Sequence, residues 1–446
     1  MHTIKNTIVS IAAFALAATG ASASVNLKVE PESGAVLAGK AQNIAVKISL
    51  AGIEPEAADF GKGIKERPAI NLAIVIDRSG SMQGDRIRVA REAAIEAVNM
   101  LGERDIVSII IFDHTAEVLV PAQSAANKDS IIRKIRSVEA RGSTAIFAGV
   151  SLAQEELGKF LSKDRVNRVI LLSDGQANVG PSSPDELGRL GATLRKQGVS
   201  ATTIGLGLDY NEDLMTRLAG KSDGNSYFAE TSRDLPRIFA AELKDTLSVV
   251  AQGVKLRVEF ENGALPTEIL GREGRIDGNA VILDFNQIYG GQEKFVIVRT
   301  AVPSGEPAQT RQIARARATY FNPFNERETV ASAMGHIRYS ADTEAVRRSA
   351  DINVQKDLIV LENAIALERA IELNDAGRNR EASEILNKSA IKMMNFGADN
   401  NMPKVEAAGK LNMSRAAAQS VRPITPAERK EYSTESYQEQ TQQKSR

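Results

Sequence analysis

The sequence predicts an α/β protein in which a doubly wound, mostly parallel sheet is inserted in a β-sandwich and followed by a C-terminal helical hairpin. Between Pro68 and about Val250, apolar runs alternate with amphipathic stretches of helical length, as in repeated strand–helix–strand units. On both sides of this region, polar and apolar residues alternate with the period of a half-buried strand. Residues 352–396 then space their apolar residues as helices do. The length of 446 residues allows two or three domains.

Residues 1–23 have the features of a secretory signal peptide. Lys5 gives a positive start, the apolar stretch 8–18 is short for a membrane span, and residues 21–23 are small, as at a cleavage site. We therefore expect cleavage before Ser24 and an exported protein, either periplasmic or secreted. The alternative is a membrane anchor that is not cleaved. No later segment has the apolar length of a membrane span.

The composition excludes several classes of function. The chain has no cysteine, which excludes disulfides and thiolate metal sites. Lys plus Arg equals Asp plus Glu at 56 each, and no basic stripe stands out, so neither nucleic acid nor anionic lipid is expected as a partner. The apolar fraction of 43% is ordinary, so a sizeable core of Val, Ile, Leu and Ala can form.

Residues 24–67 are expected to begin the sandwich, because residues 43–50 alternate polar and apolar side chains. Residues 68–250 then form the α/β region. Its first strand, residues 71–76, is a continuous apolar run, as expected for a strand covered on both faces. A capping box at Ser183, with proline next to it, fixes the start of one helix. Further strands are predicted at 106–112, 168–172 and 200–206, and helices at about 85–102, 129–138, 145–161, 184–197, 211–219 and 233–248.

The second part of the sandwich is expected at residues 251–345. Apolar residues alternate with charged ones from Val254 to Phe260. Residues 315–321 and 328–333 flank a turn around Asn322 and Pro323, which predicts a hairpin. Strands on both sides of the α/β region therefore favour one sandwich that receives it as an insertion.

Residues 346–418 are predicted to be helical, with a hairpin at 352–396. Leu358 and Leu361 begin a helical stripe that ends at Gly377. The tail, residues 419–446, is polar and contains two prolines, so it is expected to be disordered.

Oxygen-bearing side chains stand where predicted strands end or a helix begins. Asp77, Ser79 and Ser81 directly follow the first buried strand. Thr144 lies at the start of a helix, and Asp174 ends a later strand. Loops at the carboxyl ends of parallel strands line the crevice in which ligands bind, so we expect these side chains to converge there.

Five oxygen ligands without nitrogen or sulfur suit a hard cation, so Mg²⁺ is expected, with Mn²⁺ or Ca²⁺ as alternatives, rather than Zn²⁺. Two carboxylates leave a dication site about neutral, and the hydroxyls donate weakly, so the metal stays electrophilic. Mg²⁺ normally has about six ligands and keeps several waters. An Asp or Glu carboxylate of a protein partner could displace one water, which favours adhesion over chemistry.

The Asp-x-Ser-x-Ser, distal Thr and Ser-Asp-Gly elements resemble the metal-ion-dependent adhesion site of von Willebrand factor type A domains, over about residues 68–250. Residues 205–212 also resemble bacterial members named calcium-activated chloride channel homologues, whose vertebrate relatives include inter-alpha-trypsin inhibitor heavy chains. The resemblance implies a protein-binding module in which ligand binding shifts the last helix, here 233–248. It also implies a set of metal ligands, some of them through water: Asp77, Ser79, Ser81, Thr144 and Asp174.

Other interpretations have less support. Residues 34–40 have the spacing of a phosphate-binding loop, but Ala41 replaces the hydroxyl residue that would hold Mg²⁺. An enzyme is not expected: only His114 and His336 remain after signal removal, and no serine lies in a Gly-x-Ser-x-Gly elbow. A phosphatase would need a second carboxylate where Ser79 stands. The open alternative is a scaffold whose metal only stabilises the fold, with contacts made by the sandwich or the helical hairpin.

Overall fold

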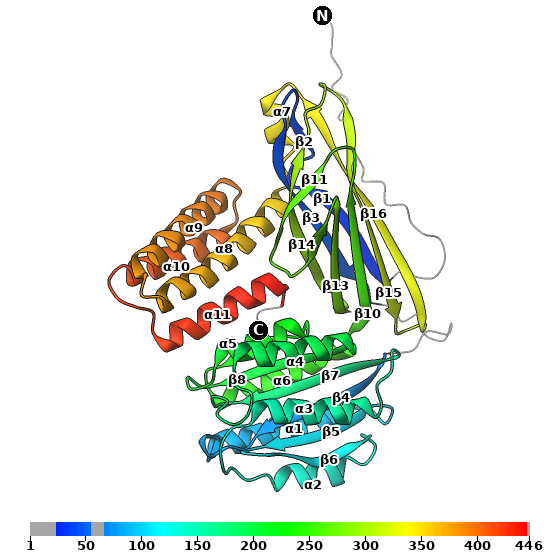
Figure 1. Ribbon diagram of the computed structural model, residues 1–446, viewed down its shortest axis with the longest axis vertical. Helices are drawn as coiled ribbons and strands as arrows, with labels where there is room; N and C mark the ends of the chain where they lie inside the picture. The colour runs from blue at the N-terminus through cyan, green and yellow to red at the C-terminus, as the bar shows by residue number, and fades with distance from the viewer. Residues whose placement is uncertain (1–23, 55–66, 444–446) are drawn as a thin grey trace, which may run out of the picture.

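The computed structural model describes residues 24–54 and 67–443. A sandwich lies above an α/β domain, and a group of helices lies at one side (Figure 1). The arrangement confirms the predicted fold class. The predicted signal peptide, residues 1–23, lies outside the described residues. Of the helices that the structure describes, none is both long and apolar enough to cross a membrane.

The α/β domain is built on a sheet with the strand order β6-β5-β4-β7-β8-β9. β6 pairs antiparallel with β5, and the other neighbours pair in parallel. Every residue from Ile70 to Asp77 of β4 is buried, because helices cover both faces of the sheet. The strands are β4 (Ala69–Asp77), β5 (Ile106–Phe112), β6 (Ala116–Ser124), β7 (Arg165–Ser173), β8 (Val199–Leu206) and β9 (Ser226–Ala229).

Two groups of helices pack on this sheet. α1, α2 and α6 share one core with Ile74 of β4, and α3, α4 and α5 share the opposite core with Val75. The predicted capping box at Ser183 is present at the start of α4. The helices are α1 (Asp85–Met100), α2 (Lys128–Arg136), α3 (Ile146–Gly158), α4 (Pro184–Lys196), α5 (Glu212–Lys221) and α6 (Leu235–Leu247), with 3₁₀ turns η2 (Gly80–Met82) and η3 (Ser232–Asp234).

The sandwich has sheets of order β1-β3-β14-β11 and β12-β13-β10-β15-β16-β2, which enclose one apolar core. Each sheet contains strands from before and after the α/β domain, which is therefore an insertion. The predicted hairpin around Asn322 is confirmed, because β15 and β16 pair antiparallel there. The strands are β1 (Val25–Pro31), β2 (Ala35–Leu37), β3 (Gln42–Gly52), β10 (Val249–Phe260), β11 (Leu265–Leu270), β12 (Arg275–Asp277), β13 (Ala280–Tyr289), β14 (Glu293–Val302), β15 (Thr310–Asn322) and β16 (Arg327–Ser340).

The helical part is larger than the predicted hairpin. After α7 (Thr343–Arg348) come α8 (Ile352–Asp375), α9 (Asn379–Asp399), α10 (Pro403–Gln419) and α11 (Pro426–Thr441), and we call α8 to α11 the helical domain. The predicted disorder of residues 419–446 is wrong, since α11 occupies most of that stretch. Thr425 and Glu428 form a capping box with Pro426 at the first helical position, and Tyr432 is buried, so the helix has both a start signal and an anchor.

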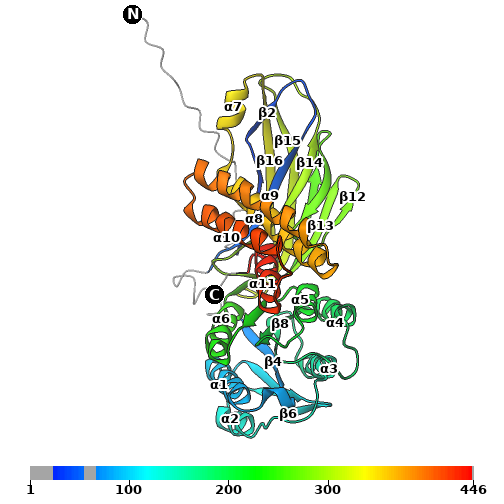
Figure 2. The ribbon, with the colours of Figure 1, turned by 90° about the vertical axis from the view of Figure 1, so that its left-hand side faces the viewer.

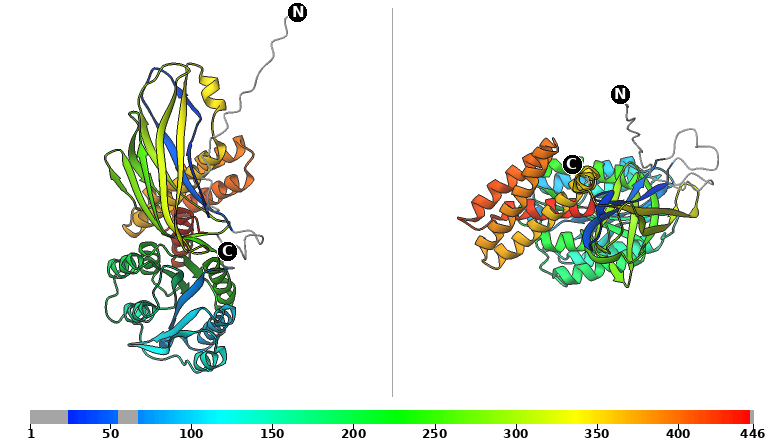
Figure 3. Two further views of the ribbon diagram at one scale, coloured as in Figure 1. Left: turned by 90° about the vertical axis from the view of Figure 1, so that its right-hand side faces the viewer. Right: turned by 90° about the horizontal axis from the view of Figure 1, so that it is seen from above.

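α11 lies between the rest of the helical domain and the α/β domain (Figure 2). Its Tyr437 hydroxyl donates a hydrogen bond to the Gly224 carbonyl at 2.7 Å, next to β9. Seen from above, the helical domain extends to one side of the sandwich (Figure 3). The last helix thus joins the helical domain to the edge of the α/β sheet.

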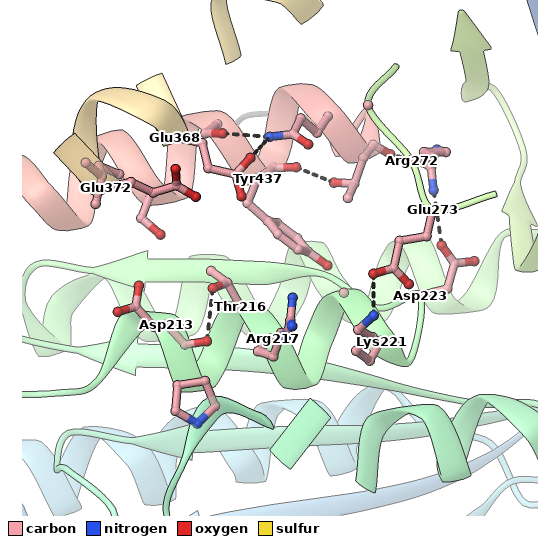
Figure 4. A pocket seen from close by; sticks show the side chains of 18 of the residues that line it. Asp213, Thr216, Arg217, Lys221, Asp223, Arg272, Glu273, Glu368, Glu372 and Tyr437 are labelled. Atoms are coloured by element: carbon pink, nitrogen blue, oxygen red, sulfur yellow. Dashed lines mark hydrogen bonds and ion pairs between the residues drawn. The ribbon is translucent and has the colours of Figure 1, made fainter. Parts of the chain in front are cut away.

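A cavity of about 660 Å³ lies where the three parts meet, below α8 and α11 and above α5 (Figure 4). Charges of both signs line it, and several of them pair with one another. Lys221 pairs with Glu273, and Arg272 lies 3.3 Å from Asp223. The predicted metal ligands do not line this cavity, so it is separate from the site described next.

Candidate metal centre

The predicted metal ligands lie at one edge of the α/β sheet. Asp77 is the last residue of β4, and Asp174 directly follows β7. Because β4 and β7 pair in parallel, their carboxyl ends bring the two acidic residues to the same edge. Ser79 precedes η2, Ser81 lies within it, and Thr144 stands two residues before α3.

Backbone hydrogen bonds hold the loops of this edge together. The Gly80 N–H donates to the Gly142 carbonyl at 2.9 Å, and the Arg141 N–H donates to the Arg78 carbonyl at 2.6 Å. The loop after β4 therefore runs beside the loop that carries Thr144. These backbone hydrogen bonds hold two loops that are distant in sequence next to each other.

Asn178 joins the third loop to this pair. Its Oδ1 accepts from the Thr144 N–H at 2.9 Å, and its own N–H donates to the Thr144 carbonyl at 3.1 Å. Asn178 was not among the predicted site residues. The only signal was its position four residues after Asp174, in a segment that had no predicted structure.

A chain of hydrogen bonds connects four of the predicted ligands. Asp77 Oδ1 accepts from the Ser79 N–H at 2.8 Å. The Oγ atoms of Ser79 and Ser81 lie 3.1 Å apart, and the Ser81 hydroxyl donates to Asp174 Oδ1 at 2.7 Å. The structure therefore brings these side chains within direct contact of one another.

The hydroxyl of Thr144, the fifth predicted ligand, lies beside Gly175. A Cβ atom added to Gly175 would stand 3.0 Å from Thr144 Oγ1 and 3.7 Å from Ser81 Oγ. Both hydroxyl oxygens thus lie on the side of Gly175 that a side chain would occupy. A side chain at position 175 would crowd the Thr144 hydroxyl, which explains the need for glycine in the Ser-Asp-Gly element.

Burial sets the electrostatics of the site. Asp77 and Asp174 are both fully buried, whereas Ser81 is exposed at the outer side. Burial raises the pKa of Asp77 to about 6, although hydrogen bonds from Ser173 and Ser79 oppose this shift. Two buried carboxylates at one place are costly to ionise without a positive charge nearby.

An arginine of the protein itself brings a positive charge to the Asp174 carboxylate. Arg86, in the first turn of α1, donates from Nη1 to Asp174 Oδ2 and lies 3.4 Å from the Ser81 carbonyl. Arg78, inside the Asp-x-Ser-x-Ser element, points elsewhere and donates from Nε to Asp113 at 3.0 Å. Arg86 was not among the predicted site residues either. Its place five residues after Ser81, at a helix start, is the signal that could have found it.

The donor set fits a hard divalent cation. It offers carboxylate and hydroxyl oxygens, which Mg²⁺, Mn²⁺ and Ca²⁺ prefer, and the Arg86 guanidinium shows that the place attracts positive charge. Across the described residues, no group of three or more His, Cys, Asp or Glu side chains could hold a metal, so any metal here depends on the hydroxyls. Metal binding by these five residues stays a prediction.

Comparison with known proteins agrees with this geometry. Residues 71–241 match the family described as von Willebrand factor type A domain. Uncharacterized protein YfbK of Escherichia coli (strain K12) is 34% identical over 206 residues, which cover 46% of this chain and 36% of that protein. Uncharacterized protein sll0103 of Synechocystis sp. is 24% identical over 334 residues, covering 73% of this chain and 78% of that protein.

Human inter-alpha-trypsin inhibitor heavy chain H4 is 28% identical over 200 residues, 43% of this chain and 21% of that protein. This chain therefore matches about a third of the Escherichia coli relative and about a fifth of the human one.

Solved structures share the fold over most of the chain. A von Willebrand factor type A protein from Catenulispora acidiphila has a TM-score of 0.68 at 15% identity and covers 88% of this chain and 91% of its own. The ArnB paralog VWA2 from Sulfolobus acidocaldarius has a TM-score of 0.61 at 19% identity, with coverages of 94% and 99%. At these identities the likeness shows the fold alone. Together with the family match, it establishes that this chain contains a von Willebrand factor type A domain.

Proposed function

We propose that this protein is an exported, cation-dependent binding module. Its metal ligands would be Asp77, Ser79, Ser81, Thr144 and Asp174, with Mg²⁺ as the expected ion. The bound ion would accept an Asp or Glu carboxylate from a partner protein. Domains of the von Willebrand factor type A generally mediate protein–protein contacts, and some do so through a metal.

The observation that supports the proposal most is the convergence of two buried carboxylates and three hydroxyls at one sheet edge. Two negative charges balance a dication, and neutral hydroxyls leave the ion able to attract a further anionic oxygen. Such an oxygen-only site is the kind that Mg²⁺ takes, with about six ligands and retained waters.

Burial suggests the side from which a partner would approach. Asp77, Ser79, Thr144 and Asp174 are buried, so their oxygens would form the inner part of the coordination shell. Ser81 and the neighbouring Gly80 are exposed. A ligand oxygen of the partner would therefore enter next to these two residues.

We propose binding and not catalysis, because the groups that could act as a nucleophile or a base already make hydrogen bonds or ion pairs within the protein. Both oxygens of Asp77 accept hydrogen bonds, one from the Ser79 N–H and one from the Ser173 hydroxyl. His114, whose side chain is mostly exposed, lies with Nδ1 3.0 Å from Asp113 Oδ1. Neither group is therefore arranged as a nucleophile or as a base for one.

Export rests on the signal-like composition of residues 1–23. Expression in a bacterial host with N-terminal sequencing of the protein from the periplasm tests it. A mature chain beginning near Ser24 supports export, and an intact Met1 in the cytoplasmic fraction contradicts it.

The metal is tested first, by calorimetric titration of the mature chain with MgCl₂, MnCl₂ and CaCl₂. We expect uptake of about one ion per chain and loss of uptake in Asp77→Ala. Asp129→Asn is the matched control, since Asp129 is an exposed acid at the start of α2, away from the site. No heat from any of the three ions would overturn the proposal.

The partner is tested by capture from an envelope fraction, with and without Mg²⁺. Capture should vanish in EDTA and with Asp77→Ala, and it should persist with Asp129→Asn. Free glutamate or acetate should compete when a carboxylate completes the metal shell. Capture that survives both EDTA and Asp77→Ala would instead support a scaffold that binds its partner elsewhere. The candidate binding surface would then be the helical domain, which is ion-paired to the α/β domain.

A further inference from the structure

Arg86 holds an unusual place for a residue beside a cation site. Its side chain is 34% exposed, yet Nη1 donates to Oδ2 of the fully buried Asp174 carboxylate. The other oxygen of that carboxylate, Oδ1, accepts from the Ser81 hydroxyl. Both oxygens of Asp174 are thus engaged by groups of this chain.

Arg86 and the Ser81 hydroxyl take two of the about four acceptor positions of the Asp174 carboxylate, so a cation that ligates Asp174 would share it with Arg86. The guanidinium has donors and no acceptors, so it cannot itself become a ligand. A dication and a guanidinium on one carboxylate would also repel each other in a buried setting, where charges are poorly screened. We therefore expect Arg86 to move away from Asp174 when a metal binds.

A second carboxylate, that of Asp209, lies near the other terminal nitrogen of Arg86. Asp209, in the loop between β8 and α5, is 74% exposed, and its Oδ2 lies 3.8 Å from Arg86 Nη2. Arg86 Nη2 would also lie 3.3 Å from a Cβ on Gly207, so the guanidinium rests against the backbone of that loop. A small rotation of the side chain would exchange Asp174 for Asp209 as its partner.

The loop that carries Asp209 is held firmly. The Tyr210 ring covers Gly205, where no Cβ would fit, and Lys430 of α11 lies 4.9 Å above that ring. The ring is buried and also contacts Phe228. The backbone next to Asp209 is therefore anchored through Tyr210, which keeps the Asp209 carboxylate within reach of Arg86.

We propose that Arg86 is a built-in counter-ion of the metal site, which neutralises Asp174 when no metal is bound and moves to Asp209 when a cation enters. This inference rests on the proposed function, and it adds a residue that sets the metal affinity. Arg86 is a positioning residue: it acts on the ion only through Asp174. The exchange lowers the apparent affinity, because the ion binds only the fraction of molecules in which Arg86 has left.

The test is a calorimetric titration of the full mature chain with MnCl₂ and MgCl₂. Arg86→Gln removes the competing charge, so we expect the affinity to rise at least about tenfold, as for a competitor that occupies the site more than nine-tenths of the time. Arg86→Lys keeps the charge and should stay within about threefold of the natural chain. Circular dichroism and thermal melting confirm that each variant folds.

Asp209→Asn completes a double-mutant cycle. It removes the second acceptor, so metal binding should weaken several-fold while Arg86 is present and should not change in the Arg86→Gln background. A merely structural role for Arg86 predicts no such coupling. Weakening of equal size in both backgrounds would mean that Asp209 acts on the ion directly, which overturns the exchange.

The outcomes separate this inference from the proposed function. If the natural chain binds metal and Arg86→Gln binds it equally or more weakly, the counter-ion role is wrong and the proposed function stands. If neither chain binds any ion, both are wrong. If Arg86→Gln does not fold, Asp209→Asn decides alone, since an unchanged affinity then overturns the exchange.

Discussion

The Lys430 ammonium group on α11 lies 2.7 Å from the Glu212 carboxylate at the start of α5, and both side chains are buried. Arg429, the preceding residue, also pairs with Glu212 and with Asp213 and Asp375. The last helix of the chain is therefore ion-paired to the α/β domain and to α8 at once. These charges act together with the buried Tyr432 and with hydrogen bonds from Ser436 and Tyr437 to hold α11 in place.

Lys430→Met should release α11 from the α/β domain. Removal of one partner leaves the buried Glu212 charge undercompensated, and we expect a loss of about 3 kcal/mol in the free energy of unfolding. Urea unfolding measures this loss, and hydrogen exchange should show faster exchange in residues 426–441. The control is Lys410→Met on α10, where an exposed pair with Glu406 is removed and a change below about 0.5 kcal/mol is expected.

The same contact predicts a pH dependence. Burial alone would raise the pKa of Glu212, but Lys430 and Arg429 outweigh burial and hold it below its ordinary value of 4.5. A carboxyl group whose pKa is lowered by folding stabilises the fold above its unfolded pKa and loses that effect as the pH falls. The melting temperature of Glu212→Gln should therefore lie below that of the natural chain at neutral pH, and the gap should shrink below about pH 4.5. A gap that is constant from pH 3 to 7 would contradict this account.

Arg168 ties three elements together inside the molecule. From β7 its guanidinium reaches Glu242 of α6 at 3.5 Å and Gln287 of β13 at 2.6 Å, and its side chain is fully buried. Arg168→Met leaves the Glu242 charge buried without its counter-ion, so we expect a loss of about 3–5 kcal/mol, measured by urea unfolding. Arg237→Met on the exposed side of α6 is the control and should change stability little.

The sequence predicted the centre of this fold because its signals are local. The apolar run 71–76 marks a strand that is buried on both faces, and Asp77 and Asp174 stand where such strands end. The structure brings Asp77 and Asp174 to one edge because the parallel pairing of β4 and β7 leaves little freedom in where these two strands end.

The tail was mispredicted for the opposite reason. α11 is polar, and its anchors, Glu212 and Ser226, lie more than 200 residues away in sequence, where no pattern indicates a contact. The start of α11 could nevertheless have been predicted, because Thr425 to Glu428 has the same capping box as the helix that begins after Ser183. The roles of Arg86, in the first turn of α1, and of Asn178, in the loop after β7, depend on where their side chains point, which sequence spacing does not fix.

Ligand binding should change the exchange rates of α6 and the first strand after it. α6 ends at Leu247 and β10 begins at Val249, so a shift of the helix must reach the sandwich. Hydrogen exchange is measured with MgCl₂ and sodium acetate, which serves as a minimal carboxylate ligand. We expect altered protection in residues 233–260 of the natural chain and none in Asp77→Ala. Unchanged exchange in this segment would mean that the site and the sandwich are not coupled.

Asp77→Asn should have opposite effects with and without metal. Burial raises the pKa of Asp77 to about 6, which means that the ionised side chain costs about 2–3 kcal/mol at neutral pH when no cation compensates it. An uncharged asparagine avoids that cost and can still accept from the Ser79 N–H, so the metal-free variant should melt at the same temperature as the natural chain or higher.

With Mg²⁺ the order should reverse. A ligand at about a hundred times its Kd stabilises the folded natural chain by about 2.7 kcal/mol, whereas Asp77→Asn lacks one of the two anionic ligands and gains little. Thermal melting of both chains in EDTA and in a series of MgCl₂ concentrations measures the crossover. A variant that is less stable than the natural chain by the same amount under both conditions would show that Asp77 serves the fold and not the ion.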